Sequence, residues 1–148
     1  MKNKLNFFKL ILLLSVFSVS ANSSANMSSD DPRELVKFPE MMQQHMMANM
    51  RDHVAALNEI LEFMGNNQAD KAADVAENRL GMSSLDNHGA SHMASMMPKG
   101  MQAAGTSMHR AASRFALKAQ EGDLLPAYKA LSDITAACVS CHTAYRIR

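Results

Sequence analysis

The sequence predicts an all-α fold, an antiparallel four-helix bundle, and three observations support this prediction. The chain of 148 residues has only six glycines, four prolines and few β-branched runs, so many short strands are not expected. Hydrophobic residues make up 47% of the chain, which is enough for one domain with a real core. In the longer segments, apolar residues recur at spacings of three and four, as on the packed face of a helix.

The expected domain covers residues 34–148 and contains four helices, over 34–64, 68–80, 98–121 and 126–145, with a long loop over 82–97. In the first helix the predicted inward face is Met47, Met50, Val54, Leu57, Leu61 and Met64. In the second it is Ala69, Ala72, Ala73, Ala76 and Leu80, and in the third Met101, Met108, Ala111 and Phe115. In the fourth it is Leu131, Ile134, Cys138, Cys141 and Tyr145. This arrangement would place any group bound at the two cysteines between helices.

The charge balance excludes one broad class of partner. The chain has 15 Lys and Arg against 14 Asp and Glu, a net charge of +1, and no basic cluster. Binding of nucleic acid is therefore not expected, because phosphate contacts need clustered basic side chains. The unusual feature of the composition is its 14 methionines.

The first 21 residues have the pattern of a secretory signal peptide. Lys2, Lys4 and Lys9 form a basic start, Leu10 to Val19 is apolar, and Ala21 ends a small-residue cleavage site, with a second site after residue 25. A membrane anchor is the alternative, but the apolar run is shorter than the roughly 20 residues that a spanning helix needs. The sequence therefore predicts an exported, periplasmic protein with a polar lead-in over residues 22–33 and no stable membrane span after signal removal.

The only two cysteines lie close together, and a histidine follows them. Cys138, Cys141 and His142 form a Cys-x-x-Cys-His sequence, the attachment pattern of c-type haem. On a helix these positions share one face, so two thiols and an imidazole can reach one porphyrin. The alternatives are a disulfide, a thioredoxin-like redox pair, a structural zinc site and a chance match of a short motif. A thioredoxin-like pair would need a βαβ context, and a zinc site would need a second pair of ligands; the sequence indicates neither.

The C-terminal part of the chain resembles the cytochrome c′ family. The resemblance rests on the string from Phe115 through Ala-Gln-Glu-Gly-Asp-Leu, and on the ending Cys-x-x-Cys-His-x-x-Tyr-Arg from Cys138. It is good over 98–148, weaker over 36–64 and poor over 82–97. It implies a four-helix bundle with one haem, Tyr145 beside that haem, His142 as the proximal iron ligand and a homodimer through the first helices.

The family divides according to the residue on the open side of the iron. Members with an apolar residue there are five-coordinate and bind small gases such as nitric oxide, whereas members with methionine are six-coordinate electron carriers. The family frame matches Gln43-Gln44, Met47 and His53, with Gln43 in place of an arginine. The resemblance therefore implies Met47 as the distal ligand, a role that competes with plain core packing for a methionine at this spacing.

The remaining methionines and histidines suggest copper. Thioether and imidazole ligands select Cu(I), and the candidate ligands are Met42, His45, Met46, His88, His92 and Met93. Adaptable packing is the alternative. His53 and His109 lie on predicted helices and are expected to be surface residues.

Three functions follow, and none of them makes the chain an enzyme, because it has no recognisable catalytic motif. The first is a periplasmic monohaem cytochrome that transfers single electrons between redox partner proteins. The second is a five-coordinate cytochrome that binds nitric oxide or another small gas. The third is a copper-binding or copper-handling protein.

Overall fold

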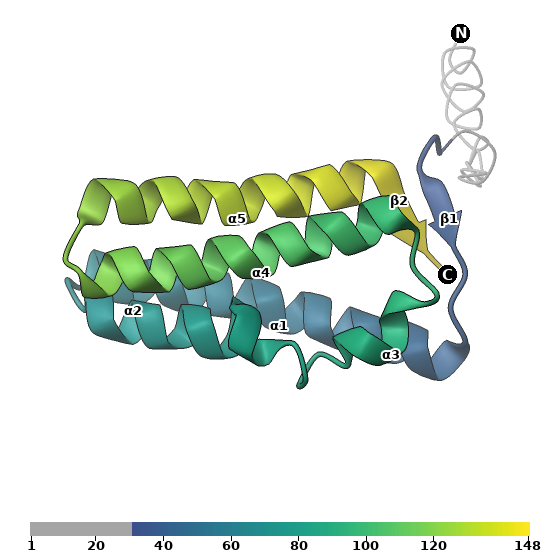
Figure 1. Cartoon of the computed structure of the whole chain (residues 1–148), viewed down its shortest axis with the longest axis horizontal. Helices are drawn as coiled ribbons and strands as arrows, with labels where there is room; N and C mark the ends of the chain where they lie inside the picture. Colours follow the sequence, from purple (N-terminus) through teal and green to yellow (C-terminus); the bar gives the residue numbers. More distant parts are fainter. Residues whose placement is uncertain (1–30) are drawn as a thin grey trace, which may run out of the picture. The chain divides into compact units, whose positions relative to one another are not determined.

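The computed structural model describes residues 31–148, which are mostly helical with two short strands (Figure 1). The elements are β1 Glu34–Val36, α1 Glu40–Gly65, α2 Ala69–Val75, the π-helical turn η1 Ala76–Leu80, the 3₁₀ turn η2 Met82–Ser84, α3 Ala90–Ala94, α4 Lys99–Gln120, α5 Leu124–Ala144 and β2 Tyr145–Ile147. The predicted signal peptide, with cleavage after residue 21 or 25, and residues 22–30 of the lead-in lie outside the described residues.

The ends of the long helices follow local backbone chemistry. Pro39 and Pro98 directly precede α1 and α4, where a fixed φ and a missing N–H do not interrupt helical hydrogen bonds. After α1, Asn67 takes the left-handed conformation with φ 57°. Gly122, with φ 74°, makes the turn between α4 and α5.

A short parallel strand pair corrects two predicted helix ends. β1 pairs with β2 in the register Glu34 with Tyr145 and Val36 with Ile147. The first helix therefore begins at Glu40 and not at residue 34, and the last ends at Ala144 and not at Tyr145. The last helix also begins earlier than predicted, at Leu124.

The segment predicted as a loop, residues 82–97, contains η2 and α3. Between them Gly89 has φ 61° and leads into α3. The positive φ favours glycine here, and a Cβ on Gly89 would also make a tight contact of 3.1 Å with His45 Nε2. The described part of the chain holds no helix that combines the length and the apolar character required to cross a membrane.

The helices pack in a consecutive order that produces one main core. α1 packs on α2, α2 on α4, and α4 on α5, with α4 and α5 side by side and antiparallel (Figure 1). The main core consists of Ala56, Ile60, Met64, Ala72, Ala73, Ala76, Leu80, Met108, Ala111, Ala112, Phe115, Ala116, Ala119, Ala127, Ala130, Leu131 and Ile134. The predicted inward faces of the second, third and fourth helices are thus largely confirmed. The many alanines allow close approach of the helices around Phe115.

A second buried group, the methionine cluster, lies beside the strand pair. Its buried members are Val36, Phe38, Met46, Met93 and Met101, and Met42, Met50, Met96, Met97, Cys141, Tyr145 and Ile147 pack against them. Five segments contribute: β1, α1, the region around α3, the start of α4, and the end of α5 with β2. Seven methionines therefore meet at the end of the molecule that carries the cysteines.

The predicted inward face of α1 is confirmed for half of its residues: Met64 is buried, and Met50 and Leu57 pack against the buried clusters. The buried residues of α1 are Met46, His53, Ala56, Ile60 and Met64. Met47, Val54 and Leu61 are instead 41%, 69% and 55% exposed. Small Ala56 and polar His53 occupy interior positions, so the pattern of large apolar residues marks the neighbouring face.

Candidate functional site

The two thiols lie on the last turns of α5, between the two buried clusters. Cys138 packs against the main core, whereas Cys141 packs in the methionine cluster. Both are half-buried and neither forms a disulfide. Burial raises the pKa of both thiols, and the neighbouring Cys138 raises that of Cys141 further. The side chains are therefore neutral, free thiols on one helix face.

His142 lies next in the chain and on the flank of α5. Its side chain is exposed, and its carbonyl oxygen accepts a hydrogen bond of 3.5 Å from Arg33 Nη1. Position 142 is about 100° around the helix from Cys141 but only about 40° from Cys138, so the imidazole lies at the edge of the thiol face, where it is exposed. The imidazole is thus accessible to a group that the thiols would hold.

Tyr145 follows α5 as the first residue of β2 and belongs to the methionine cluster. Its hydroxyl lies against Gly100, where a Cβ would be only 2.2 Å from the tyrosine oxygen. The absence of a side chain on Gly100 therefore allows the ring of Tyr145 to lie against the start of α4.

Three methionines of α1 belong to the same cluster as Cys141. Met42, Met46 and Met50 are spaced by four residues and share one face of α1, with Met46 fully inside. Met47 lies on the adjacent surface, in an open hollow that Gln43, Gln44 and Arg51 also line. Met46 is therefore the residue buried in the cluster of Cys141. The resemblance to the cytochrome c′ family implies the next residue, Met47, at this place.

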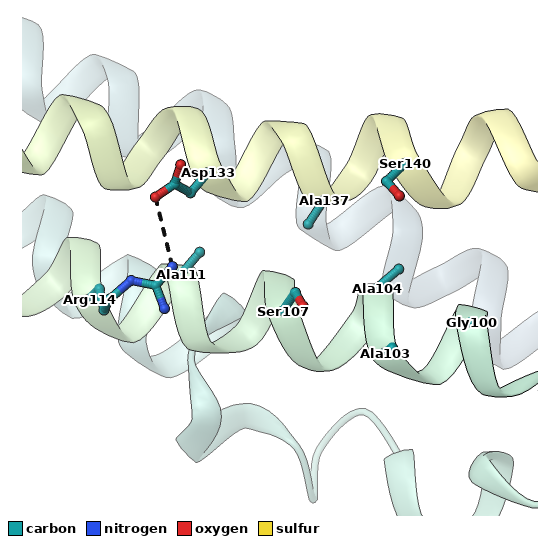
Figure 2. A pocket seen from close by; sticks show the side chains of 9 residues that line it. All are labelled: Gly100, Ala103, Ala104, Ser107, Ala111, Arg114, Asp133, Ala137 and Ser140. Atoms are coloured by element: carbon teal, nitrogen blue, oxygen red, sulfur yellow. Dashed lines mark ion pairs between the residues drawn. The ribbon is translucent and has the colours of Figure 1, made fainter.

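An open groove between α4 and α5 lies on another face of the cysteine helix. Figure 2 shows its lining, which is mostly small side chains, and an ion pair of 3.8 Å between Arg114 and Asp133 near one end. The groove volume is about 420 Å³. Ala137 and Ser140 line it and each precedes a cysteine by one residue, whereas the cysteines themselves pack inward. The groove is therefore not the space that the thiols face.

The structure places the candidate copper ligands in different surroundings. Met42, Met46 and Met93 belong to the methionine cluster. His45 donates a 2.9 Å hydrogen bond from Nε2 to the carbonyl oxygen of His88, and His92 is exposed. The side chain of His88 points elsewhere, into a group of histidines.

That histidine group is a feature that the sequence did not predict. His53 of α1, His88 of the segment before α3 and His109 of α4 are 8%, 8% and 7% exposed, with their rings in mutual contact. The expectation that His53 and His109 lie on the surface is wrong. The three residues come from separate segments with no common motif, so only the folded chain brings them together.

Comparison with known proteins adds no assignment, because no family model, curated protein or solved structure matches the chain. The site is defined by its residues alone: two free thiols, an adjoining imidazole and a thioether-rich interior.

Proposed function

We propose that this protein is an exported monohaem c-type cytochrome of the cytochrome c′ type, a four-helix bundle that transfers single electrons. In this proposal the bundle consists of α1, α2 with η1, α4 and α5. One observation carries the proposal: two free thiols share a face of α5, a histidine follows them, and methionines from α1 pack in the same cluster as one of the thiols.

The residues fit a covalently held porphyrin. Each thiol would add across one vinyl group, with sulfur bonding to one vinyl carbon and hydrogen to the other, so the addition needs no oxidant. The one-turn separation of Cys138 and Cys141 sets the span between the two bonds. The space beside Cys141 is filled by methionine, whose unbranched side chain readily takes a new rotamer around an inserted ring, whereas Cys138 borders the main core.

Two side chains are proposed as iron ligands. His142 is the proximal ligand, since it adjoins the thiols and its imidazole is exposed. Met46 replaces Met47 as the proposed distal ligand, because Met46 is 7% exposed within the cluster of Cys141 whereas Met47 is 41% exposed outside it. When bound, a haem with histidine and methionine ligands supplies a one-electron iron couple at raised potential.

Around these ligands the chain would exclude water. Phe38, Met93 and Met101 are nearly fully buried in the cluster, and Tyr145 covers it from the side of β2. A dry, weakly polar surrounding favours the less charged reduced iron and limits reorganisation when an electron moves. The proposed partners are periplasmic redox proteins.

A homodimer is also proposed, and an exposed apolar stripe on α1 supports it. Met47, Val54 and Leu61 are spaced by seven residues and are 41%, 69% and 55% exposed. This is the spacing of a helix seam that packs against a second helix. Light scattering during size-exclusion chromatography of the wild type and Val54→Lys tests the proposal: a dimer that the variant abolishes is expected, and a monomeric wild type would contradict it.

The experiment that tests the electron carrier is an optical and mass analysis of the protein exported by a host that attaches haem c. We expect an intact mass raised by one haem, lost in the double variant Cys138→Ala/Cys141→Ala, and a low-spin spectrum with a methionine–iron band in the oxidised form. The neighbouring methionines supply a matched pair: Met46→Ala should remove the band, whereas Met47→Ala should keep it.

Other outcomes discriminate between the three functions. Absence of haem in the wild-type mass would overturn the cytochrome proposal altogether. A haem with a high-spin spectrum that shifts with nitric oxide would replace electron transfer by gas binding. Loss of the band in Met47→Ala and not in Met46→Ala would return the distal position to Met47.

A further inference from the structure

The buried histidines form a compact group apart from the cysteine end. His53, His88 and His109, here called the histidine trio, have ring centroids 4.8 Å, 5.3 Å and 6.1 Å apart. Each is more than nine-tenths buried. Three polar rings in one enclosed space require partners for their nitrogens, because an unsatisfied buried polar atom destabilises the fold.

Hydrogen bonds fix which nitrogen of two rings carries the proton. His109 Nδ1 lies 2.7 Å from the carbonyl oxygen of Leu80, which can only accept, so Nδ1 is the protonated nitrogen. His88 Nδ1 lies 3.4 Å from Ser84 Oγ, and that hydroxyl already donates its hydrogen to Gly81 O. His88 Nδ1 is therefore also the donor. In both rings Nε2 keeps a free lone pair, the arrangement of histidines that ligate metals.

The third ring, His53, has a nitrogen that lacks a hydrogen-bond partner within residues 31–148. His53 Nε2 is fully buried and has no hydrogen-bond partner among the described residues. Burial lowers the pKa of His53 to about 4, with the nearby His88 and His109 adding to the effect, so the ring is neutral at pH 7. All three rings can therefore present an unprotonated Nε2.

The ring separations are close to those of a three-histidine metal centre. With metal–nitrogen bonds of about 2.0–2.1 Å and tetrahedral angles, two rings on one ion have centroids about 5 Å apart. The ring centroid of His88 lies 4.8 Å from that of His53 and 5.3 Å from that of His109. Only the pair of His53 and His109, at 6.1 Å, is wider.

We propose that the histidine trio binds one first-row transition ion that favours imidazole, with Zn²⁺ as the probe, through Nε2 of each ring. Within residues 31–148, no group of three or more His, Cys, Asp or Glu side chains is arranged to hold a metal in the conformation described. Binding therefore requires the rings to turn about their Cβ–Cγ bonds and the two outer rings to approach.

The surrounding charges suit a cation. Asp52 lies one residue from His53, and Arg79 pairs with both Asp52 and Glu59, at 2.6 Å for Glu59. Within this group, the Asp52 carboxylate acts on both His53 and His88, and the Arg79 guanidinium acts on His53. His45 and Asn49 both donate to the carbonyl oxygen of His88, which holds the segment that carries the central ring against α1. The proposed site thus joins α1, α4 and the segment between them.

The test is calorimetric titration of the exported protein with Zn²⁺. Its thiols are either occupied by haem or, if the chain carries none, blocked by alkylation, so the result does not depend on the cytochrome proposal. We expect one ion per chain. His53→Gln should weaken binding by about 100-fold or more, while His92→Ala, which removes an exposed histidine, should leave it unchanged.

A second variant separates ligation from folding. In His109→Asn the side-chain amide can still donate to Leu80 O from the place of Nδ1, but Nε2 is absent. We expect the circular dichroism spectrum and unfolding midpoint to stay near those of the wild type while Zn²⁺ affinity falls. Absence of stoichiometric binding by the wild type, or binding that His53→Gln and folded His109→Asn leave intact, would overturn the proposal.

Discussion

The two buried clusters of this protein are built from different side chains. The main core combines ten alanines with seven larger residues, and Ala56, Ala112 and Phe115 in it are completely buried. The methionine cluster has seven methionines from several segments, and many of its members are only half-buried. In the main core the helix backbones approach closely, so its shape is fixed by the helices. In the methionine cluster, long side chains fill a wider space.

This difference bears on where the proposed haem could be held. A close-packed core of alanine tolerates little change in volume, because nothing nearby can move far. A methionine side chain has several rotatable bonds and adapts to a new neighbour. The end of the molecule that carries Cys141 and Tyr145 is therefore the end that can admit a large group, while the other end keeps the helices in register.

The largest expected effect comes from removing the central side chain of the main core. Phe115→Ala should lower the free energy of unfolding by about 3–5 kcal/mol, since the rigid surroundings leave a cavity. Met93→Ala, at a position 3% exposed in the methionine cluster, should cost only about 2 kcal/mol, because neighbouring methionines can move into the space. Denaturant unfolding of both variants measures the two losses in free energy of unfolding. Equal losses would mean that the two clusters are equally rigid.

A larger side chain should also destabilise the main core more than the methionine cluster, but the loss in free energy of unfolding should be smaller than for Phe115→Ala. Ala112 is fully buried between helices, so Ala112→Leu should destabilise by about 1–3 kcal/mol through overpacking. Met101→Leu, which keeps the volume nearly constant, should cost less than about 1.5 kcal/mol. Ala103→Leu on the exposed side of α4 serves as the control for helix propensity in urea unfolding of the three variants. A neutral Ala112→Leu would contradict close packing of the main core.

The smallest expected effect is at two glycines of α4. A Cβ on Gly105 would have no neighbour within 4 Å, so Gly105→Ala should stabilise by about 0.5–1 kcal/mol through helix propensity. Gly100→Ala places a methyl group against the Tyr145 hydroxyl, so it should lose that gain or destabilise. Thermal unfolding compares the two variants. An equal gain at Gly100 would indicate that the Tyr145 ring moves freely.

Helix faces could be predicted where large residues mark them. The buried face of α4 contains the four residues that the spacing predicts, Met101, Met108, Ala111 and Phe115. On α1 the same spacing misleads for a physical reason. The face that packs inward contains His53 and Ala56, while the exposed face contains larger apolar residues such as Val54. Hydrophobic periodicity cannot separate two apolar stripes when the outer one is the more hydrophobic.

The candidate site also has one part that is visible in the sequence and another that is visible only in the folded chain. The cysteine pair and His142 could be predicted because their chemistry lies within five consecutive residues. The histidine trio and the strand pair could not, since each depends on contacts between segments far apart in the sequence. Three-residue strands such as β1 and β2 also carry too few side chains to give a period of two.

The parallel pairing of β1 with β2 has a consequence for the order of folding. Its two segments come from opposite parts of the described chain, so the entropy of closing a long loop delays their contact. α4 and α5 adjoin through one short turn and can pair early. In the interval between these events, Cys141 already lies on its helix but is not yet covered by Val36 and Phe38, which belong to the same cluster. A bulky group would reach the sulfur of Cys141 more easily during that interval than after the cluster has closed.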